Sequence, residues 1–502
     1  MNGKKRILSL FQFLSGNWLF LSILLVGAIL RTYKIREYLV FLGDEGRDVL
    51  VLKRMFINHE FTLLGPITSV GGMYLGPAYY YFIAPFFWFF GFDPVGPAIM
   101  VALVGVATIF LVYRVGSEFF SRATGLWAAL FYATSPLVIT YSRSSWNPNV
   151  LPFFSLLVIY GLLKVVVKKQ WNWLFVASFS IGIALQLHYL ALMFIVIYGF
   201  ILLYLRKDLT VKRLVLAISG SFISFSPFIF FEVRHQFPNT QTIWHFLNQS
   251  GQSATLGFSN IFGRFIDYSQ RIFASLLAGQ KLPFTGILIL FIAASLAIYI
   301  FRKRQEKTSL KALNVILLWL GVGTGVYSIY RGVVYDYYFT PVFPAPFLIL
   351  GIVFAQLAQK KVWGKVIVTV LSIGLIFMHF SNSPHKYGPN DQVTQTENIA
   401  RFILGKTEGK PYNLALISSG NSDHAYRFFL EMWGYPPTTI ENKEVDPKRQ
   451  SVTDQLLIVC EDKICQPLGH SLWEIAGFGA AEVAGVWEVF PVKIIRLVSY
   501  RS

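Results

Sequence analysis

Long apolar segments recur along the chain, separated by short polar connections. Eleven of them approach the length of about 20 residues that a helix needs to cross the hydrocarbon core of a bilayer. Barrel strands would instead give short segments in which apolar and polar residues alternate. We therefore predict a polytopic α-helical membrane protein with about 11 transmembrane helices, near residues 15–32, 94–113, 123–141, 150–167, 173–187, 190–205, 214–231, 283–301, 312–329, 339–357 and 363–380.

The distribution of basic residues sets the orientation of these helices. A net charge of +18 raises the question of a nucleic-acid partner. The basic clusters, however, lie in alternate connections, on the side of the N-terminus, as the positive-inside rule requires of a cytoplasmic face. We expect an integral protein of a prokaryotic plasma membrane, with a cytoplasmic N-terminus, contacts to membrane lipids and no nucleic-acid partner.

One apolar segment, residues 74–90, does not fit the count. It is short, contains Pro77 and Pro85, and is bracketed by glycines. A full crossing here would invert every later connection and place the basic clusters outside. We therefore predict an interfacial or re-entrant element inside one long first external loop, residues 33–93.

The two ends of the chain differ in character. Basic residues followed by an apolar run resemble a signal peptide, but no small-residue cleavage site follows, so a retained first helix is expected. After a transmembrane domain at 1–381, strand-like and helix-like patterns predict a small extracytoplasmic α/β domain at 382–502. The two cysteines, Cys460 and Cys465, lie there; a disulfide and two reduced thiols both stay open.

An acidic pair lies just beyond the first apolar segment. The sequence Gly43-Asp44-Glu45-Gly46-Arg47-Asp48 stands out because the chain has only 26 acidic residues among 502. Carboxylates beside a membrane face are often functional, and catalysis is the leading interpretation. The structural alternative is a solvated helix start, where acids are favoured by the helix dipole. Asp48 is interpreted as a partner for a neighbouring arginine.

Further chemistry-bearing residues are expected on the same external face. A carboxylate can accept a proton from a hydroxyl, and guanidinium groups suit the oxygens of a phosphate. Such a set favours sugar transfer from a lipid phosphate. The candidates are Arg47 after the first span, Arg143 after the third, His188 after the fifth, Arg234 and His235 after the seventh, and Arg331, Tyr335 and Tyr338 after the ninth.

The order of these motifs resembles the GT-C membrane glycosyltransferases, in particular the protein O-mannosyltransferases and lipid A aminoarabinose transferases. The resemblance covers about residues 1–380. It is carried by the Asp-Glu of the first loop, Gly-Pro-Ala-Tyr-Tyr-Tyr (76–81), Ser-Pro with Tyr-Ser-Arg (135–143), a histidine near the fifth span, Phe-Glu-Val-Arg-His (231–235) and Tyr-Tyr-Phe-Thr-Pro-Val-Phe-Pro (337–344).

The resemblance implies inverting transfer from a polyprenyl-phosphate sugar to a hydroxyl of a protein, lipid or glycan acceptor at the extracytoplasmic face. It makes Asp44 the general base, with Glu45 orienting the acceptor or the base. Arg143, Arg234 and Arg331 would hold the donor phosphate. Relatives often have an acid soon after the position of Arg143, where this chain has Asn147 and Asn149. We expect no metal site and no required cofactor, with a divalent cation left open.

Each candidate also has a structural interpretation. Arg143 and Arg234 are equally explained as snorkelling anchors at the ends of spans. His188 and His235 are typical of hydrogen-bonded histidines between helices. Residues 263–277 form an amphipathic pattern that predicts a helix lying on the membrane. A transporter or lipid flippase is one alternative function class, but the predicted spans carry almost no charge in their middles. A structural membrane subunit is another, for which the acidic loop would be incidental.

Overall fold

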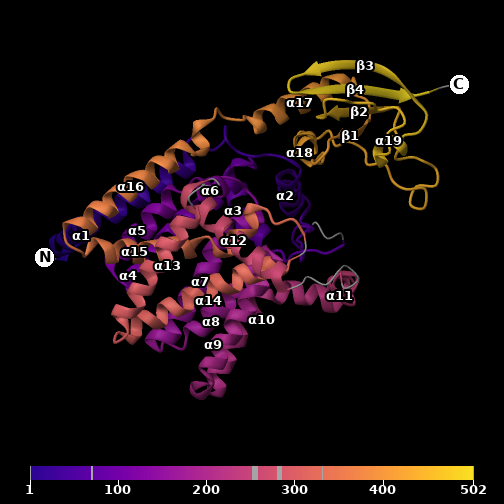
Figure 1. Cartoon of the computed structure of the whole chain (residues 1–502). Coiled ribbons are helices and arrows are strands. Elements are labelled where there is room, and N and C mark those ends of the chain that lie inside the picture. Colours follow the sequence, from indigo (N-terminus) through magenta and orange to yellow (C-terminus); the bar gives the residue numbers. More distant parts are fainter. Residues whose placement is uncertain (1, 69–71, 251–257, 280–284, 331, 501–502) are drawn as a thin grey trace. The chain divides into compact units, whose positions relative to one another are not determined.

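A computed structural model describes residues 2–68, 72–250, 258–279, 285–330 and 332–500 (Figure 1). Two compact units are distinguished by their internal contacts. The helical unit comprises Met1–Tyr33, Thr62–Ile83 and Ala98–Gly388, and the mixed unit comprises Lys34–Phe61, Ala84–Pro97 and Pro389–Ser502. Much of the first loop, predicted as part of the transmembrane domain, thus groups with the C-terminal residues, because helix α2 (Gly43–Lys53) packs on α18 (His424–Met432).

Within the described residues, all eleven predicted apolar segments overlap helices, since apolar side chains can be buried or face lipid while the helix satisfies its own backbone. The helices that contain them are α1 (Asn2–Thr32), α4 (Val95–Phe119), α5 (Arg122–Thr134) with α6 (Pro136–Tyr141), η2 (Asn147–Val150) with α7 (Leu151–Lys168), α8 (Trp173–Leu187), η3 (Tyr189–Leu192) with α9 (Met193–Tyr204), α10 (Val211–Arg234), α13 (Thr285–Lys303), α14 (Lys307–Ile329), η5 (Asp336–Val342) with α15 (Pro344–Ala358) and α16 (Val362–Ser381).

Fewer helices than predicted are long enough to cross a membrane. Among the described residues, six helices are long and apolar enough to cross a membrane, or seven if η5 and α15, bent by 60°, form one span. Three shorter apolar helices cover Gly16–Thr32, Trp173–Leu187 and Tyr189–Tyr204. The remaining predicted span is broken before Pro136, where the proline ring cannot continue the helix of α5. The predicted count of about 11 is not confirmed.

The segment at 74–90 contains α3 (Ala78–Phe89), which has 12 residues. At 1.5 Å per residue this helix is about 18 Å long, well below the thickness of about 30 Å of a hydrocarbon core. Its interfacial or re-entrant placement stays a prediction. The other short elements are η1 (Arg54–Asn58), η4 (Arg206–Asp208), α11 (Pro238–Ser250) and η6 (Pro384–Lys386).

The amphipathic segment at 263–277 forms part of α12 (Phe258–Ala278). Its apolar residues Ile272 and Leu276 are fully buried, because α12 packs on α13, α14, α15 and α16 of the same unit. This apolar face covers protein, so the helix is not an amphipathic helix that lies free on a membrane surface. Ser135 and His379 contact the carbonyls of Leu276 and Leu277 at its C-terminal end, at 2.6 and 2.8 Å.

The mixed unit contains a four-stranded sheet with the order β1-β2-β4-β3. Strands β1 (Asn413–Ile417) and β2 (Gln455–Cys460) are parallel, joined through α18, and β2 and β3 (Ala481–Val489) are each antiparallel to β4 (Val492–Ser499). β1 and β2 are buried along their whole length, as expected for strands covered on both faces. Helices α17 (Gln392–Thr407) and α19 (Trp473–Ala476) complete this part.

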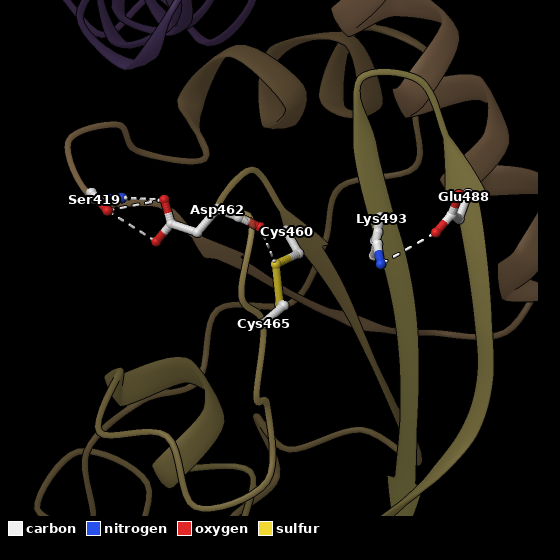
Figure 2. The surroundings of a disulfide bond; sticks show 6 residues. All are labelled: Ser419, Cys460, Asp462, Cys465, Glu488 and Lys493. Carbon is white, nitrogen blue, oxygen red and sulfur yellow. Dashed lines mark hydrogen bonds and ion pairs between the residues drawn. A yellow bond between two sulfur atoms is a disulfide. The ribbon is translucent and has the colours of Figure 1, made fainter.

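A disulfide joins Cys460, the last residue of β2, to Cys465 (Figure 2). The sequence left this pairing open, and the structure shows it. Figure 2 also shows Ser419, in the loop after β1, donating to Asp462 within the bridged loop, at 3.0 and 3.1 Å. The loops that follow the two parallel strands are therefore tied to each other next to the disulfide.

Candidate functional site

The acidic pair occupies the first turn of α2 in the mixed unit. The helix begins at Gly43, after Leu42 in an extended conformation. The Glu45 carboxylate accepts a hydrogen bond from the Leu42 backbone N–H at 3.1 Å, which satisfies a donor that the start of a helix leaves open. Asp44 and Glu45 both lie at the positive end of the helix dipole, where acids are stabilised.

Asp44 and Glu45 lie in opposite environments although they are neighbours. The Asp44 side chain is 53% exposed, whereas Glu45 is only 7% exposed. Burial raises the pKa of Glu45 from 4.5 to about 8, and its backbone hydrogen bonds oppose this rise only in part. At neutral pH Glu45 therefore carries a proton for most of the time. The Asp44 side chain, in contrast, is accessible to solvent.

Arg47 links Asp44 to Asp48. Its Nη1 lies 2.8 Å from Asp44 Oδ1, and its Nε and Nη2 lie 3.0 and 2.8 Å from Asp48 Oδ1. Asp48 is fully buried, so its charge needs this partner. The prediction that Asp48 pairs with an arginine is confirmed. Arg47, a candidate site residue, is held by both acids and fixes the side chain of Asp44.

Close packing of glycines places α2 against α18 within the mixed unit. A Cβ at Gly46 would lie 2.3 Å from the backbone nitrogen of Ala425 and 2.5 Å from its Cα. A Cβ at Gly43 would lie 2.1 Å from Ser422 Oγ. The two glycines that flank Asp44 and Glu45 therefore allow the approach of the two helices. A largely buried ion pair between α2 and α18 stabilises the same contact: Lys53 Nζ lies 2.9 Å from Glu431 Oε2.

Asn421 fixes the first residue of α2. Its Oδ1 accepts from the Gly43 backbone N–H at 2.7 Å, and its Nδ2 lies 2.9 and 3.1 Å from the two carboxylate oxygens of Glu461. Glu461 also accepts from the Tyr426 hydroxyl at 2.8 Å. Asn421 and Glu461 were not predicted from the sequence. The available signal was that they lie in the connections that follow the parallel strands β1 and β2.

In the helical unit, three of the predicted candidates are brought together. The His188 ring lies 5.3 Å from the Tyr338 ring, and Tyr335 lies 5.9 Å from Tyr338. The Tyr337 ring lies 4.5 Å from the rings of both Tyr338 and Trp146. His188 accepts from the Leu190 backbone N–H at 3.1 Å and so begins η3.

Two arginines that were not predicted as site residues lie beside this aromatic cluster. Arg271 of α12 lies 3.1 Å from Asp336 and from the Val334 carbonyl. Arg264, two helical turns earlier on the same face, donates to the Tyr330 carbonyl. Their spacing of seven residues was visible in the sequence, but their partners were not.

Arg143 is buried in the helical unit and contacts the end of α1. It donates to the carbonyls of Leu30 at 2.8 Å and Tyr33 at 2.6 Å, and lies 3.4 Å from the His385 ring. Cations are favoured at a helix C-terminus, where carbonyl groups lack helical partners. This contact gives Arg143 a structural role; its predicted role toward a phosphate stays a prediction.

The predicted site residues at the end of α10 are exposed. Arg234 is exposed at the last residue of α10, and His235 stacks on Phe231 at 4.1 Å. Arg331 lies outside the described residues. Asn147 and Asn149 donate to the carbonyls of Leu187 and Ser144 at 2.6 and 2.8 Å, which gives both amides a structural use.

No metal centre is evident in the part of the chain that the structure describes, where no group of three or more His, Cys, Asp or Glu side chains is arranged to hold an ion. The asparagines at 147 and 149 supply no carboxylate. The prediction that no metal or cofactor is required is not tested by this arrangement.

Comparison with known protein sequences gives one family and two relatives. Residues 75–231 match the family described as dolichyl-phosphate-mannose-protein mannosyltransferase. Two proteins of Bacillus subtilis strain 168, both named as mannosyltransferases, are similar: YycA is 34% identical over 104 residues and YkcB 26% identical over 118 residues. These matches span 21% and 23% of this chain, and only 15% and 16% of the relatives' own lengths.

Comparison with solved structures extends the likeness to nearly the whole fold. The crystal structure of ArnT from Cupriavidus metallidurans bound to undecaprenyl phosphate matches with a TM-score of 0.62 at 16% identity, over 96% of this chain and 98% of ArnT. The Archaeoglobus fulgidus oligosaccharyltransferase in its apo form matches with a TM-score of 0.53 at 14% identity, over 85% of this chain and 65% of that protein. At such identities the likeness shows the fold.

Proposed function

We propose that this chain transfers a sugar from a polyprenyl-phosphate donor to a hydroxyl acceptor. The proposal is supported by the mannosyltransferase family match at residues 75–231, by the similarity to YycA and by the fold shared with ArnT. The reaction takes place at the extracytoplasmic membrane face. The matched family is described by its dolichyl-phosphate-mannose donor, and the ArnT structure holds undecaprenyl phosphate, so a lipid-linked donor is the shared chemistry. The acceptor is a protein, lipid or glycan hydroxyl.

The observation that carries the proposal is the opposite exposure of two adjacent acids on one helix turn. Asp44 presents an accessible carboxylate held by Arg47, and Glu45 is buried with a pKa raised to about 8. A buried acid with a strongly raised pKa beside an accessible acid is typical of catalytic sites. Asp44 acts as the base, and Glu45 positions it by holding the start of α2.

In the proposed step, Asp44 accepts the proton of the acceptor hydroxyl. The acceptor oxygen forms a bond to the anomeric carbon of the sugar from the face opposite the phosphate, and the bond from that carbon to the phosphate oxygen breaks. The electron pair leaves with the polyprenyl phosphate, so the anomeric configuration inverts. A phosphate is a good leaving group, so no separate acid is required.

Cations of the helical unit are proposed to stabilise the leaving phosphate. Arg143, Arg234 and Arg331 keep the role that the resemblance implies. We add Arg264 and Arg271 to these phosphate-binding candidates, because both belong to α12 and lie next to the aromatic cluster. Fixed guanidinium groups that stabilise developing charge commonly lower the barrier of a transfer reaction.

The proposal is tested with purified protein and a panel of radiolabelled polyprenyl-phosphate sugars, with release of polyprenyl phosphate as the readout. The Asp44→Asn variant is expected to lose at least about a hundredfold in turnover, because a general base contributes about 10²–10⁴-fold. Its fold should be retained, since Arg47 keeps its ion pair with Asp48 at 2.8 Å.

Glu60→Gln is the matched control, since it also replaces an exposed carboxylate of the first loop by an amide. It should turn over like the unmodified protein. Equal turnover by Asp44→Asn and Glu60→Gln, or no turnover of any donor by the unmodified protein, would reject the proposal. A transporter or a structural subunit would not respond to either substitution.

A further inference from the structure

A cavity of about 240 Å³ lies within the helical unit, and none of the candidate site residues that the structure describes lines it. Its lining residues come from the connection between α4 and α5, from the end of α13 and the start of α14, and from the end of α15. Its lining residues are Phe120, Ser121, Thr124, Tyr299, Arg302, Lys303, Ser309, Ile352, Ala355, Gln356, Gln359 and Lys360.

The cavity is strongly cationic. Arg302, Lys303 and Lys360 line it, and none of the described lining residues is acidic. One carboxylate lies nearby: Glu306 pairs with Lys303 and accepts from the Ser309 hydroxyl at 2.7 Å. Three cations against one acid leave a net charge of about +2, which attracts an anion.

Neutral hydrogen-bonding groups complete the lining. Ser121 caps the N-terminus of α5 by accepting from the Thr124 backbone N–H at 3.1 Å, and the positive end of that helix therefore faces the cavity region. The side-chain oxygen of Gln356 is buried and has no hydrogen-bond partner among the described residues. A buried polar atom of this kind needs an explanation, and a hydroxyl of a bound ligand would supply one.

The surroundings of the cavity are apolar and exposed. On α13, Ile298 and Phe301 are 50% and 67% exposed just before the basic end of the helix. Exposed apolar side chains next to a cationic helix end are typical of the boundary between hydrocarbon and headgroups. A ligand bound here can therefore place an anionic group among the cations and apolar chains along α13.

From these features we infer that the cavity binds a glycerol-phosphate group. Arg302, Lys303 and Lys360 contact the phosphate oxygens, with hydroxyl donors from the α5 turn, and Gln356 accepts from a glycerol hydroxyl. The same chemistry is present in the headgroup of phosphatidylglycerol and in free glycerol 3-phosphate. Guanidinium and ammonium groups are the usual partners of phosphate, and cationic recesses between transmembrane helices bind anionic headgroups.

The test measures binding of radiolabelled phosphatidylglycerol to the full-length protein in a neutral detergent, with phosphatidylcholine as the zwitterionic comparison. The triple variant Arg302→Gln, Lys303→Gln, Lys360→Gln should bind phosphatidylglycerol about tenfold or more weakly, because each cation near an anionic headgroup contributes to binding. Gln356→Leu, which changes no charge, should weaken binding by a smaller factor, about threefold.

The matched control is Arg206→Gln, Lys207→Gln, Lys212→Gln, which removes the same charges from exposed positions of the same unit. It should bind like the unmodified protein. If free glycerol 3-phosphate displaces the radiolabelled phosphatidylglycerol, the cavity also accepts the soluble ligand. If it does not, the lipid is the ligand of the cavity. Equal loss in both triple variants, or equal binding of phosphatidylcholine, would overturn the inference.

Discussion

Position in the tertiary structure, more than residue type, separates the roles of Asp44 and Glu45. Both are carboxylic acids in one helix turn, yet one is 53% exposed and the other is buried. A buried acid favours its neutral form because the ion loses its hydration. The exposed acid has Arg47 as its neighbour at 2.8 Å. The proposed division of labour, with Asp44 as base and Glu45 as support, follows from this difference.

The state of Glu45 predicts a pH dependence of stability. Its pKa is raised from 4.5 to about 8, so between these values the folded protein binds a proton that the unfolded chain releases. Stability from this group therefore falls as pH rises from 4.5 to 8. Glu45→Gln cannot ionise and should gain about 2–5 kcal/mol relative to the unmodified protein at pH 8.5, and almost nothing near pH 4.5.

Thermal melting of the two proteins in the same detergent, from pH 4.5 to 8.5, measures this effect. Glutamine keeps an acceptor for the Leu42 N–H, so the cap of α2 is retained. Melting curves whose separation does not change with pH would show that Glu45 is ionised in the folded protein.

Asn421 is predicted to be a positioning residue for Asp44, a role that rests on the proposed function. Asn421→Ala removes the bond to the Gly43 N–H and leaves Glu461 without its amide donor. Turnover should fall about tenfold or more through kcat, with the KM for the donor nearly unchanged, because small displacements of a base are costly. Asn421→Asp should not restore turnover, since it places a carboxylate against Glu461.

Ser419→Ala is the control for Asn421, because Ser419 also donates to a carboxylate, that of Asp462, from the same loop (Figure 2). Ser419→Ala should leave kcat within about twofold of the unmodified protein. It should lower the free energy of unfolding by a small amount, similar to the loss caused by Asn421→Ala. If both variants lose kcat equally, the effect is a general loosening of the loop.

At the scale of elements, the glycines of α2 explain the form of the acidic motif. Gly46 lies so close to Ala425 that a methyl group would overlap its backbone. Since backbone atoms cannot move as a flexible side chain can, α2 and α18 would have to separate. The motif Gly43-Asp44-Glu45-Gly46 thus combines two acids with the contact that fixes their helix.

Gly46→Ala is predicted to destabilise the mixed unit by about 1–3 kcal/mol, as overpacking against backbone commonly does. Gly405→Ala in α17 is the matched control, because nothing lies within 4 Å of the added methyl group there. That change should be neutral or stabilising by up to about 1 kcal/mol, since alanine favours a helix over glycine. Chemical denaturation followed by circular dichroism distinguishes the two, and equal stability of both variants would contradict the packing argument.

At the scale of the whole molecule, the predicted orientation of the chain is open to test. Fusions of alkaline phosphatase after residue 502 should be active, because the C-terminus is predicted outside, and fusions after residues 207 and 304 should be inactive. A crossing by residues 74–90 would reverse all three results. The disulfide of Cys460 with Cys465 agrees with an oxidising compartment for the C-terminal residues.

The sequence predicted much of the helical framework, because helices that are long and apolar leave a strong signal. All eleven apolar segments are found in helices. The number of crossings was predicted less well, since hydropathy does not show that the span at 123–141 breaks before Pro136 or that η5 and α15 bend by 60°. Breaks of this kind depend on packing with neighbouring helices.

The features of the candidate site likewise fall into those that the sequence predicts and those that only the tertiary structure shows. The sequence alone determined that Asp44 and Glu45 are rare acids at a helix start and that basic clusters occupy alternate connections, because composition and period are local properties. Only the tertiary structure decided that Glu45 is buried while Asp44 is exposed, that Asn421 holds Gly43, and that Arg143 contacts the end of α1. Burial and long-range hydrogen bonds join residues hundreds of positions apart, and no local pattern records which of them will meet.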